Sequence, residues 1–281
     1  MLPSGELWDE ALGCVPGAPG DVRRVAGLDG GANATWRVDT ARGLFVVRLH
    51  GDWTHTAGVD RRREAQLHRA AAQAGLAPAI IAADPAGRFL VTEFAAGEVW
   101  QAQDLGDPIR LARLARQLGE LHALPVPQVA PWSLGSLVAA HAERLAAGAG
   151  SAEPLAPMLY RAQVILAETA AAARPPCIVH NDVNHANLLG PDPVLVDWEY
   201  AAVADPLSDL ACLLAYYPEA APHLPLLLAE SGLSAIHADA LRDLAWVYTL
   251  VSWLWYRRYD LAGGMRPAER AAMEALRRRL G

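Results

Sequence analysis

Apolar residues in the first hundred positions alternate with polar ones or form short β-branched runs, and glycine-containing or polar turns separate these runs. This pattern predicts antiparallel strands over residues 21–28, 34–40, 44–50, 79–84 and 88–94. The segment between the third and fourth runs, residues 58–76, has a helix-forming composition with a small apolar face, and Gly75 suits its C-terminus. The first part of the chain is therefore expected to contain three strands, one helix and two further strands.

The hydrophobic period changes at residue 107, after which apolar residues recur at the spacing of amphipathic helices. Asp107 and Pro108 suit the N-cap and the first helical position of a helix over residues 107–124. Further helices are expected over 133–149, 157–173, 206–217, 222–231 and 234–262, with short apolar runs at 177–180 and 194–198. The chain is thus expected to be α+β, with a small lobe at residues 1–95, a larger helical lobe at residues 96–281 and a hinge near 94–97.

Composition and charge narrow the classes of protein to which the chain can belong. Hydrophobic residues make up 53% of the 281 positions, and no apolar run approaches the roughly 20 residues that span a bilayer. The formal charge of −7 disfavours nucleic-acid binding and suits a cationic ligand, and three widely spaced cysteines form no CxxC pair. The acidic N-terminus lacks the basic region of a secretory signal, so we expect a cytoplasmic protein without a membrane partner.

The polar segment HNDVNHAN, residues 180–187, carries the main candidate chemistry. Four residues separate Asp182 from Asn187, and Asp197 follows after a short apolar strand. This spacing suits a loop that presents a carboxylate base, Asp182, and two oxygen ligands for Mg²⁺, Asn187 and Asp197, around a bound phosphate. Two alternatives are a polar turn that only satisfies its own hydrogen bonds, and a zinc site on His180 and His185, which lacks a well-placed third His or Cys.

The same segment has the form HxDxxxxN, and VDWEY stands where protein kinases carry their DFG segment. Together, HNDVNHANLL and VLVDWEYAAVADPLSDLA closely resemble the aminoglycoside phosphotransferase and choline kinase superfamily, and DWEYA is similar to a segment of choline/ethanolamine and bacterial thiamine kinases. This resemblance implies a two-lobed protein-kinase-like fold, with a small antiparallel sheet and one helix in the first lobe, and the cofactors ATP and Mg²⁺. The chain has no HRD arginine, DFG or APE, which disfavours a protein kinase regulated by its activation loop.

The resemblance also places the nucleotide in the first lobe. LDGGANATWRV resembles the GGxxN turn of the superfamily and points to Gly30, Gly31 and Asn33, although an ordinary hairpin turn would use the same glycines. The adenine would contact the main chain at the hinge, in the segment TEFAAG. Those contacts imply three more cofactor-binding residues, Glu93, Phe94 and Ala95.

Arg48, in FVVRLHG, stands where protein kinases carry the VAIK lysine. The chain contains no lysine, since all 24 of its basic residues are arginine, and a guanidinium can hold a phosphate in a fork. Glu64, on the following helix, is the expected ion-pair partner of Arg48. The alternatives are an exposed strand charge for Arg48 and a solvated helix face that Glu64 shares with Arg61–Arg63.

The closing helix carries WVYTLVSWLWYRRYD, with Trp246 and Trp253 on one face. Aromatic faces attract quaternary ammonium or thiazolium groups, although helix packing is the plainer explanation for any one of these residues. Trp198, Glu199 and Asp205 lie close in sequence to Asp197, so an aromatic and acidic acceptor pocket is expected. We interpret three further residues of the resembling segments, His122, His180 and Asp209, as structural supports of the catalytic loop.

The sequence therefore predicts a small-molecule kinase that transfers phosphate from ATP to the hydroxyl of a small cationic alcohol, similar to choline, ethanolamine or thiamine. The alternatives are an aminoglycoside kinase or another small-molecule kinase of the superfamily, a catalytically silent nucleotide-binding module, and a zinc hydrolase. A small-molecule acceptor is the expected partner, and no nucleic acid is expected to bind. The sequence predicts no oligomeric state.

Overall fold

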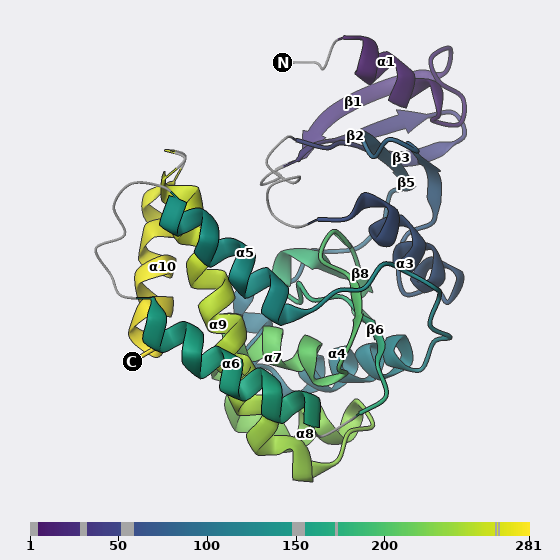
Figure 1. The fold of residues 1–281 in the computed structure, drawn as a ribbon. Coiled ribbons are helices and arrows are strands. Elements are labelled where there is room, and N and C mark those ends of the chain that lie inside the picture. The colour runs from purple at the N-terminus through teal and green to yellow at the C-terminus, as the bar shows by residue number, and fades with distance from the viewer. Residues whose placement is uncertain are drawn as a thin grey trace. The chain divides into compact units, whose positions relative to one another are not determined.

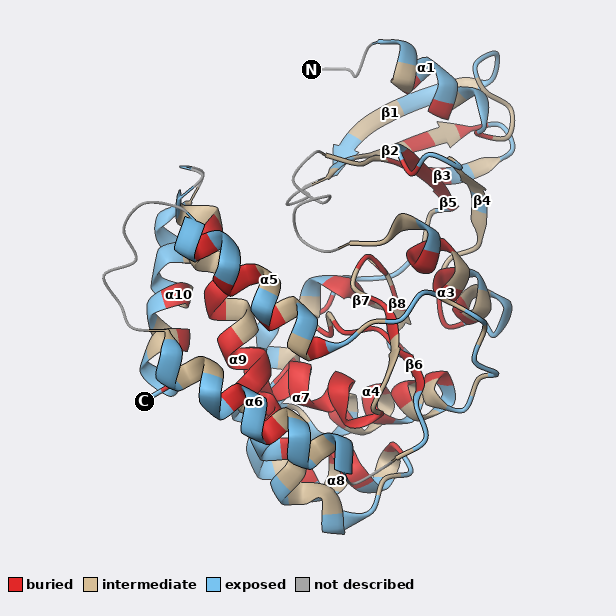
Figure 2. Ribbon diagram, in the orientation of Figure 1, coloured by how far each residue is buried: buried red, intermediate tan, exposed pale blue. Residues whose placement is uncertain are grey.

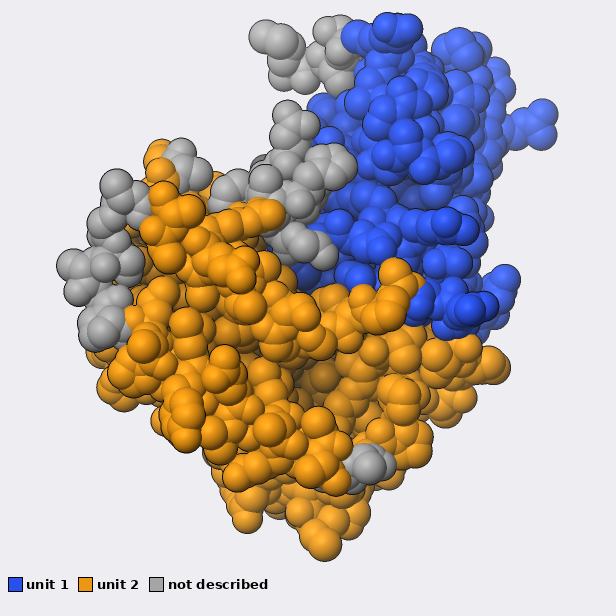
Figure 3. All heavy atoms as spheres, in the orientation of Figure 1, with its two compact units in different colours: residues 1–100, 127–129, 187–201 blue, residues 101–126, 130–186, 202–281 orange. Residues whose placement is uncertain are grey.

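The computed structural model describes residues 5–28, 33–51, 59–147, 155–171, 174–261, 263 and 265–281. The chain divides into two compact units, which Figure 3 distinguishes by colour. Unit 1 comprises Met1–Trp100, Pro127–Val129 and Asn187–Ala201, and unit 2 comprises Gln101–Val126, Ala130–Ala186 and Ala202–Gly281. The boundary predicted at residue 95 stays a prediction. Unit 1 is not one continuous stretch of the chain, since it resumes at Pro127 and again at Asn187.

Unit 1 is built on a five-stranded antiparallel sheet with strand order β1-β2-β3-β5-β4 (Figure 1). The strands are β1 (Val22–Leu28), β2 (Ala34–Thr40), β3 (Gly43–Leu49), β4 (Ile80–Ala83) and β5 (Phe89–Glu93). In the register of the two central hairpin strands, Trp36 lies opposite Val47 and Thr35 opposite Arg48. The predicted order of three strands, one helix and two strands is confirmed in these described residues.

A helix that the hydrophobic pattern did not predict, α1 (Glu6–Gly13), covers part of this sheet and contacts β3 and β5. Trp8 is buried there, and its ring meets Trp36 edge-on with the ring centres 5.2 Å apart. The apolar core of the sheet includes Phe45, Val47 and other buried side chains of β2 and β5. An apolar layer therefore packs against β3, the strand that carries Arg48.

Helix α3 (Arg61–Gln73) is the single predicted helix of this region, and Asp60 caps it by accepting hydrogen bonds from two main-chain N–H groups in the first turn. The hairpin of β7 (Leu188–Leu189) and β8 (Val194–Leu195) also belongs to unit 1. The Leu195 N–H donates to the carbonyl of Leu76, just after α3, at 2.9 Å. The segment that carries Asp197 is thus tied to the helix that carries Glu64.

Unit 2 is mainly helical, and α9 (Ala238–Leu261) packs against most of its other helices. Every residue of α7 (Leu207–Tyr216) except Tyr216 is buried, and buried residues also run along α9 (Figure 2). The remaining helices are α4 (Pro108–His122), α5 (Leu134–Ala147), α6 (Ala156–Ala171), α8 (Leu224–Glu230) and α10 (Pro267–Arg279). Helix α10 was not predicted from the sequence. None of the helices that the structure describes has the length and apolar character needed to cross a membrane.

Short elements complete unit 2 and frame the catalytic segment. Strand β6 (Cys177–Val179) pairs with β9 (Ala202–Ala204) in an antiparallel ladder. The 3-10 turns are η1 (Ala102–Gly106), η2 (His185–Asn187), η3 (Pro218–His223) and η4 (Ala235–His237). The candidate base, Asp182, therefore lies in the loop between β6 and η2.

Candidate active site

Asp209, a fully buried residue of α7, stabilises the loop that carries Asp182. The carboxylate of Asp209 accepts hydrogen bonds from the main-chain N–H groups of His180 at 3.2 Å and Asn181 at 2.8 Å. It also contacts Nε2 of His122, at the end of α4, at 2.9 Å. The prediction that Asp209 and His122 support this loop is confirmed, since one carboxylate fixes two consecutive amides.

The backbone turns at Asn181, which has a positive φ of 63°. Asparagine adopts this left-handed conformation more readily than most residues, and here its side-chain oxygen accepts a hydrogen bond from the Tyr248 hydroxyl at 2.7 Å. Burial of that hydroxyl raises the pKa of Tyr248 well above its ordinary value, so the group stays a donor at neutral pH. The residue before Asp182 is therefore fixed in both backbone and side chain.

Two consecutive tyrosines at the end of α7 contact the loop on either side of its centre. The hydroxyl of Tyr216 donates to Oδ1 of Asp182 at 3.3 Å. The hydroxyl of Tyr217 accepts from the His185 N–H at 3.0 Å and lies 2.5 Å from Nδ1 of the same residue. Burial, followed by the charge of Asp182, raises the pKa of Tyr216, and burial raises that of Tyr217 to about 12. Both phenols therefore remain neutral at physiological pH.

In unit 1, Arg48 joins a helix residue to the segment after β8. Its guanidinium forms an ion pair with Glu64 of α3, and Nη1 donates to Oδ1 of Asp197 at 2.5 Å. Arg48 and Glu64 are 8% and 2% exposed, so water screens their ion pair weakly, and the Asp197 side chain of the second pair is partly exposed. The predicted pair of Arg48 and Glu64 is present, and the exposed-charge alternative for Arg48 is wrong. Phosphate binding by Arg48 stays a prediction.

A second arginine, Arg61, extends this network. Its Nη1 donates to Glu64 at 2.6 Å and to Glu199 at 3.3 Å, and its Nη2 donates to Oδ1 of Asn33 at 3.1 Å. The amide of Asn33 in turn donates to Glu199 at 2.8 Å. Burial, with the Asp197 charge as a second cause, raises the pKa of Glu199. Because Glu64 and the Arg61 side chain are both buried, the alternative of a solvated helix face is wrong here.

The β7–β8 hairpin brings the two proposed magnesium ligands to neighbouring positions. The Val196 N–H donates to the Asn187 carbonyl at 3.1 Å, so Asn187 and Asp197 flank the same end of the hairpin. Asp197 has a positive φ of 62°, an uncommon backbone conformation for a residue with a side chain, and its side chain is 40% exposed.

The chemistry of these donors fits a magnesium ion, because carboxylate and amide oxygens are hard ligands. No group of three or more His, Cys, Asp or Glu residues that could hold a metal occurs in the described part of the chain. A magnesium ion would therefore depend on one or two protein carboxylates together with phosphate and water oxygens. That is how magnesium is usually held at phosphoryl-transfer sites.

Of the predicted nucleotide-binding residues, Gly30 and Gly31 lie outside the described residues. At the hinge, the main-chain N–H groups of Glu93 and Phe94 donate to the carbonyls of Ala79 and Leu44, both at 2.9 Å. These two donors therefore belong to the sheet. Contacts with an adenine would have to come from the carbonyls of this segment or from Ala95, and they stay a prediction.

Besides Asp182, the five residues predicted to contact the acceptor are divided between the two units. Trp198 is fully buried in unit 1, where its ring stacks on His68. In unit 2, arginine guanidinium groups lie over the rings of Trp246 and Trp253, and Asp205 forms an ion pair with Arg174. The remaining residue, Glu199, is bonded to Asn33 and Arg61. Each of the five side chains thus has a contact within its own unit, and their assignment to the acceptor stays a prediction.

Other aromatic residues of unit 2 interact with Asp182. Besides Tyr216, these include Tyr256 of α9, whose pKa is raised by burial and then by the charges of Glu269 and Asp182. The ring of Trp255 meets Tyr256 edge-on and stacks on Tyr259, with ring centres 5.2 Å apart in both pairs. We call Tyr216, Trp255, Tyr256 and Tyr259 the aromatic cluster. The sequence signal for it was the i, i+4 spacing of Trp255 and Tyr259.

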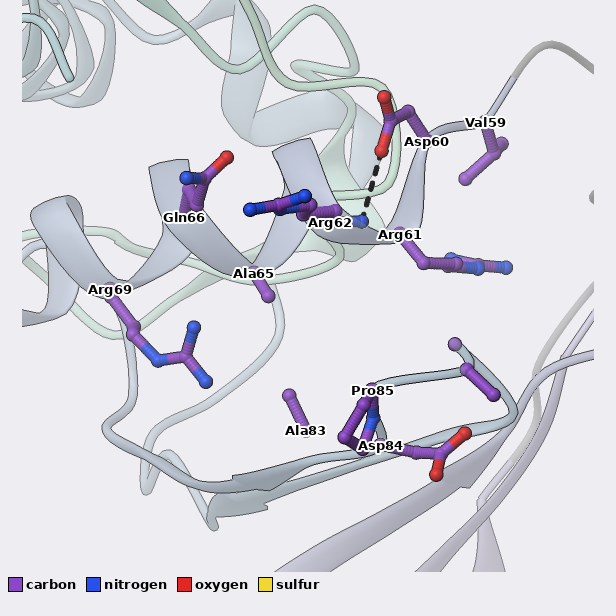
Figure 4. A pocket seen from close by; sticks show the side chains of 12 residues that line it. Val59, Asp60, Arg61, Arg62, Ala65, Gln66, Arg69, Ala83, Asp84 and Pro85 are labelled. Carbon is purple, nitrogen blue, oxygen red and sulfur yellow. Dashed lines mark hydrogen bonds between the residues drawn. The ribbon is translucent and has the colours of Figure 1, made fainter. Parts of the chain in front are cut away.

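A cavity of about 880 Å³ lies in unit 1 between the first turns of α3 and the turn that joins β4 to β5 (Figure 4). Arg61, Arg62 and Arg69 line it from the helix, and Asp84 and Pro85 line it from the turn. Neither Arg48 nor Asp197 lines this cavity. It is therefore a separate space that adjoins the charged network only through Arg61.

The fold combines a five-stranded antiparallel sheet, one capped helix and an Arg–Glu pair between them with a mainly helical second unit. This arrangement defines the protein-kinase-like class of fold. Comparison with known families supports this class, since the model of the phosphotransferase enzyme family (APH) matches residues 24–276. The chain belongs to this family. No curated protein sequence matches it.

Solved structures show the same fold. A choline/ethanolamine kinase family protein from Mesorhizobium loti has a TM-score of 0.80 and 23% identity, over 98% of this chain and 94% of that one. The choline kinase LicA from Streptococcus pneumoniae has a TM-score of 0.73 and 16% identity, over 91% and 94%. The macrolide 2′-phosphotransferase MphH from Brachybacterium faecium has a TM-score of 0.58 and 18% identity, over 91% and 93%. The predicted fold class is thus confirmed.

Proposed function

We propose that the protein transfers the γ-phosphoryl group of ATP, with Mg²⁺, to the hydroxyl of a small cationic alcohol. The observation that carries this proposal is the position of Arg48, which is ion-paired with both Glu64 and Asp197. These residues were assigned from sequence as the phosphate clamp, its helix partner and a metal ligand, and they are up to 149 positions apart. A purely structural strand arginine would not need two acidic partners of this kind.

In the proposed mechanism the protein mainly positions the acceptor hydroxyl and the phosphate. Alignment of the reacting atoms and stabilisation of charge account for most of the rate enhancement of phosphoryl transfer. Asp182 accepts the proton of the acceptor hydroxyl, and Tyr216 orients its carboxylate. Arg48 binds the phosphate oxygens. Magnesium, held by Asn187 and Asp197, would neutralise charge on the transferred phosphate.

The acceptor is proposed to be a cation because two tyrosines of the aromatic cluster, Tyr216 and Tyr256, interact with Asp182 in unit 2. Aromatic faces of the cluster attract ammonium groups by about 0.5–2 kcal/mol each, depending on desolvation. The net charge of −7 also favours a cationic substrate. The names of the similar structures include choline and ethanolamine kinases, which supports choline or ethanolamine before thiamine, and an aminoglycoside or macrolide is the alternative.

An ADP-release screen over choline, ethanolamine, thiamine, an aminoglycoside and a macrolide tests the proposal. We expect turnover with a small cationic alcohol and less with its neutral isostere, in which carbon replaces the quaternary nitrogen. Replacement of Tyr256 by alanine should raise KM for the cation and leave KM for the neutral isostere nearly unchanged. Equal KM changes for the two acceptors would contradict a cation–π role.

Asp182→Asn is the decisive variant for the chemistry. Loss of a positioned base costs about 10²–10⁴-fold in rate, so kcat should fall by that order while ATP still binds. Asp239→Asn, at a side chain that is 94% exposed, is the control for an Asp-to-Asn change elsewhere in unit 2. Nucleotide binding without turnover on any acceptor would favour the silent nucleotide-binding module.

A further inference from the structure

Arg61 occupies an unusual position for an arginine at the start of a helix. Its side chain is only 9% exposed, and its two terminal nitrogens donate to Glu64, Glu199 and Asn33 at 2.6–3.3 Å. Its Nε is buried without an acceptor among the described residues. The terminal nitrogens of the guanidinium are therefore hydrogen-bonded, and its Nε is not.

The charges of this network do not balance. Three carboxylates, on Glu64, Asp197 and Glu199, face two guanidinium groups, on Arg48 and Arg61. Removal of Arg61 would leave Arg48 as the single arginine paired with these carboxylates in the described residues. Arg48 already bonds Glu64 and Asp197, whereas Glu199 is bonded to Arg61 and Asn33 and is near the charge of Arg48 without a bond to it.

We propose that Arg61 is a built-in competitor of the divalent cation and sets its affinity at Asp197 and Glu199. A cation and a guanidinium are attracted by the same carboxylate, and Oε2 of Glu199 accepts from both Arg61 and Asn33. A metal ion that takes this oxygen must displace the guanidinium. The inference rests on the proposed function, because that function brings magnesium to Asp197.

The surroundings of Arg61 allow this exchange. Arg61 lines the cavity of about 880 Å³ between α3 and the β4–β5 turn, so a displaced guanidinium has space to enter (Figure 4). The base of its side chain packs closely against Gly87, where an added Cβ would lie only 2.9 Å from Cβ of Arg61. The charged end can therefore move while the helix turn stays in place.

Competition of this kind has a functional consequence. Without nucleotide, Arg61 keeps the carboxylates neutralised and weakens binding of free metal. With nucleotide, phosphate oxygens add ligands to the ion and supply a new acceptor for the displaced guanidinium. The metal should therefore bind strongly only together with the nucleotide.

The test measures Mn²⁺ binding to the intact protein by electron paramagnetic resonance, at one fixed pH and without nucleotide. We expect Arg61→Gln to tighten the Mn²⁺ Kd by about tenfold, since it removes a positive charge next to the ligands in a weakly screened site. Arg62→Gln, at the exposed neighbouring residue of the same helix, makes the same change in net charge and should leave the Kd within about twofold. Equal Kd values for the two variants would overturn the proposal.

Two further variants separate competition from a merely structural role. Arg61→Lys keeps the charge and should keep the wild-type Kd, and Arg61→Gln combined with Glu199→Gln should lose the gain in affinity. Circular dichroism confirms that each variant is folded. If the wild-type enzyme has no phosphotransferase activity on any acceptor, the proposed function fails; if it is active but Arg61→Gln binds Mn²⁺ as Arg62→Gln does, only this inference fails.

Discussion

Replacement of Asp209 by asparagine tests the structural account of the catalytic loop. Asp209 is fully buried and accepts hydrogen bonds from the main-chain N–H groups of His180 and Asn181, and it contacts the ring of His122. Asparagine has nearly the same shape but carries an NH₂ group in place of one oxygen. At least one of the buried donors would then face another donor.

The contacts set the size of the effect. A hydrogen bond to a charged group contributes about 1.5–3 kcal/mol, and a buried polar group left unsatisfied costs about 1–3 kcal/mol. Because the remaining side-chain oxygen can still serve one donor, we expect the free energy of unfolding to fall by about 3 kcal/mol. The value of kcat should fall at least about tenfold, because Asp182 follows the two amides directly and small misplacements of catalytic groups are costly.

Urea denaturation followed by tryptophan fluorescence measures the loss of stability, and ADP release measures kcat. Asp205→Asn is the matched control, because Asp205 lies one turn earlier, is 20% exposed and is bonded to Arg174. It should cost about 1 kcal/mol, as a partly exposed ion pair does. Equal losses in the two variants, or a change below about 0.5 kcal/mol for Asp209→Asn, would refute the argument that a buried charge orders the loop.

Three further predictions concern other sites. Gly97→Ala should lower the unfolding free energy by about 1–3 kcal/mol in thermal or urea melts. The reason is that φ of Gly97 is +143° and the new Cβ would lie 2.9 Å from the main-chain nitrogen of Gly190. An unchanged melt would contradict this close approach. Burial, together with neighbouring arginines, lowers the pKa of His141 to about 3. The unfolded chain then binds a proton that the native chain does not, so stability should fall by about 1.4 kcal/mol per pH unit between about pH 6 and 4, and His141→Gln should flatten that part of a denaturation profile. Tyr216→Phe should lower kcat about tenfold with KM for ATP unchanged, because it removes one hydrogen bond to Asp182; a matching rise in KM for ATP would argue against the assignment.

The strands of unit 1 could be predicted because apolar and polar residues alternate along a strand that has one buried face. Trp36 and Val47, for example, are opposite each other in the register and lie in runs of the predicted length. Helices α1 and α10 were not predicted, because each buries only two apolar side chains on a charged background. Met273 and Leu276 are three residues apart, which is helical spacing but too short a pattern to distinguish a docked helix from a polar tail.

In the candidate site, residues close together in sequence could be predicted, and contacts between residues far apart in sequence could not. Asp182, Asn187 and Asp197 could be proposed from sequence because their spacing along one short segment is itself the signal. The contact of Arg61 with Glu199 joins positions 138 apart, and composition around either residue does not indicate it. The roles of Trp198 and Trp253 cannot be read from sequence for a related reason, since a tryptophan packed in a core and one that binds a cation have the same sequence pattern.

The hydrogen bonds of the catalytic segment explain why it contains so many polar residues. His180 and Asn181 give their N–H groups to Asp209, and the Asn181 side chain accepts from Tyr248, while His185 is bonded to Tyr217. A loop that turns at a positive φ has no strand or helix ladder for its amides, so buried side chains must satisfy them. The His and Asn residues around Asp182 therefore build the loop, whereas the carboxylate of Asp182 has a donor, Tyr216, on a ring that remains 36% exposed. The hydrogen bond between Tyr216 and Asp182 lies at the surface, so an acceptor hydroxyl can approach the proposed base beside the phenol that orients it.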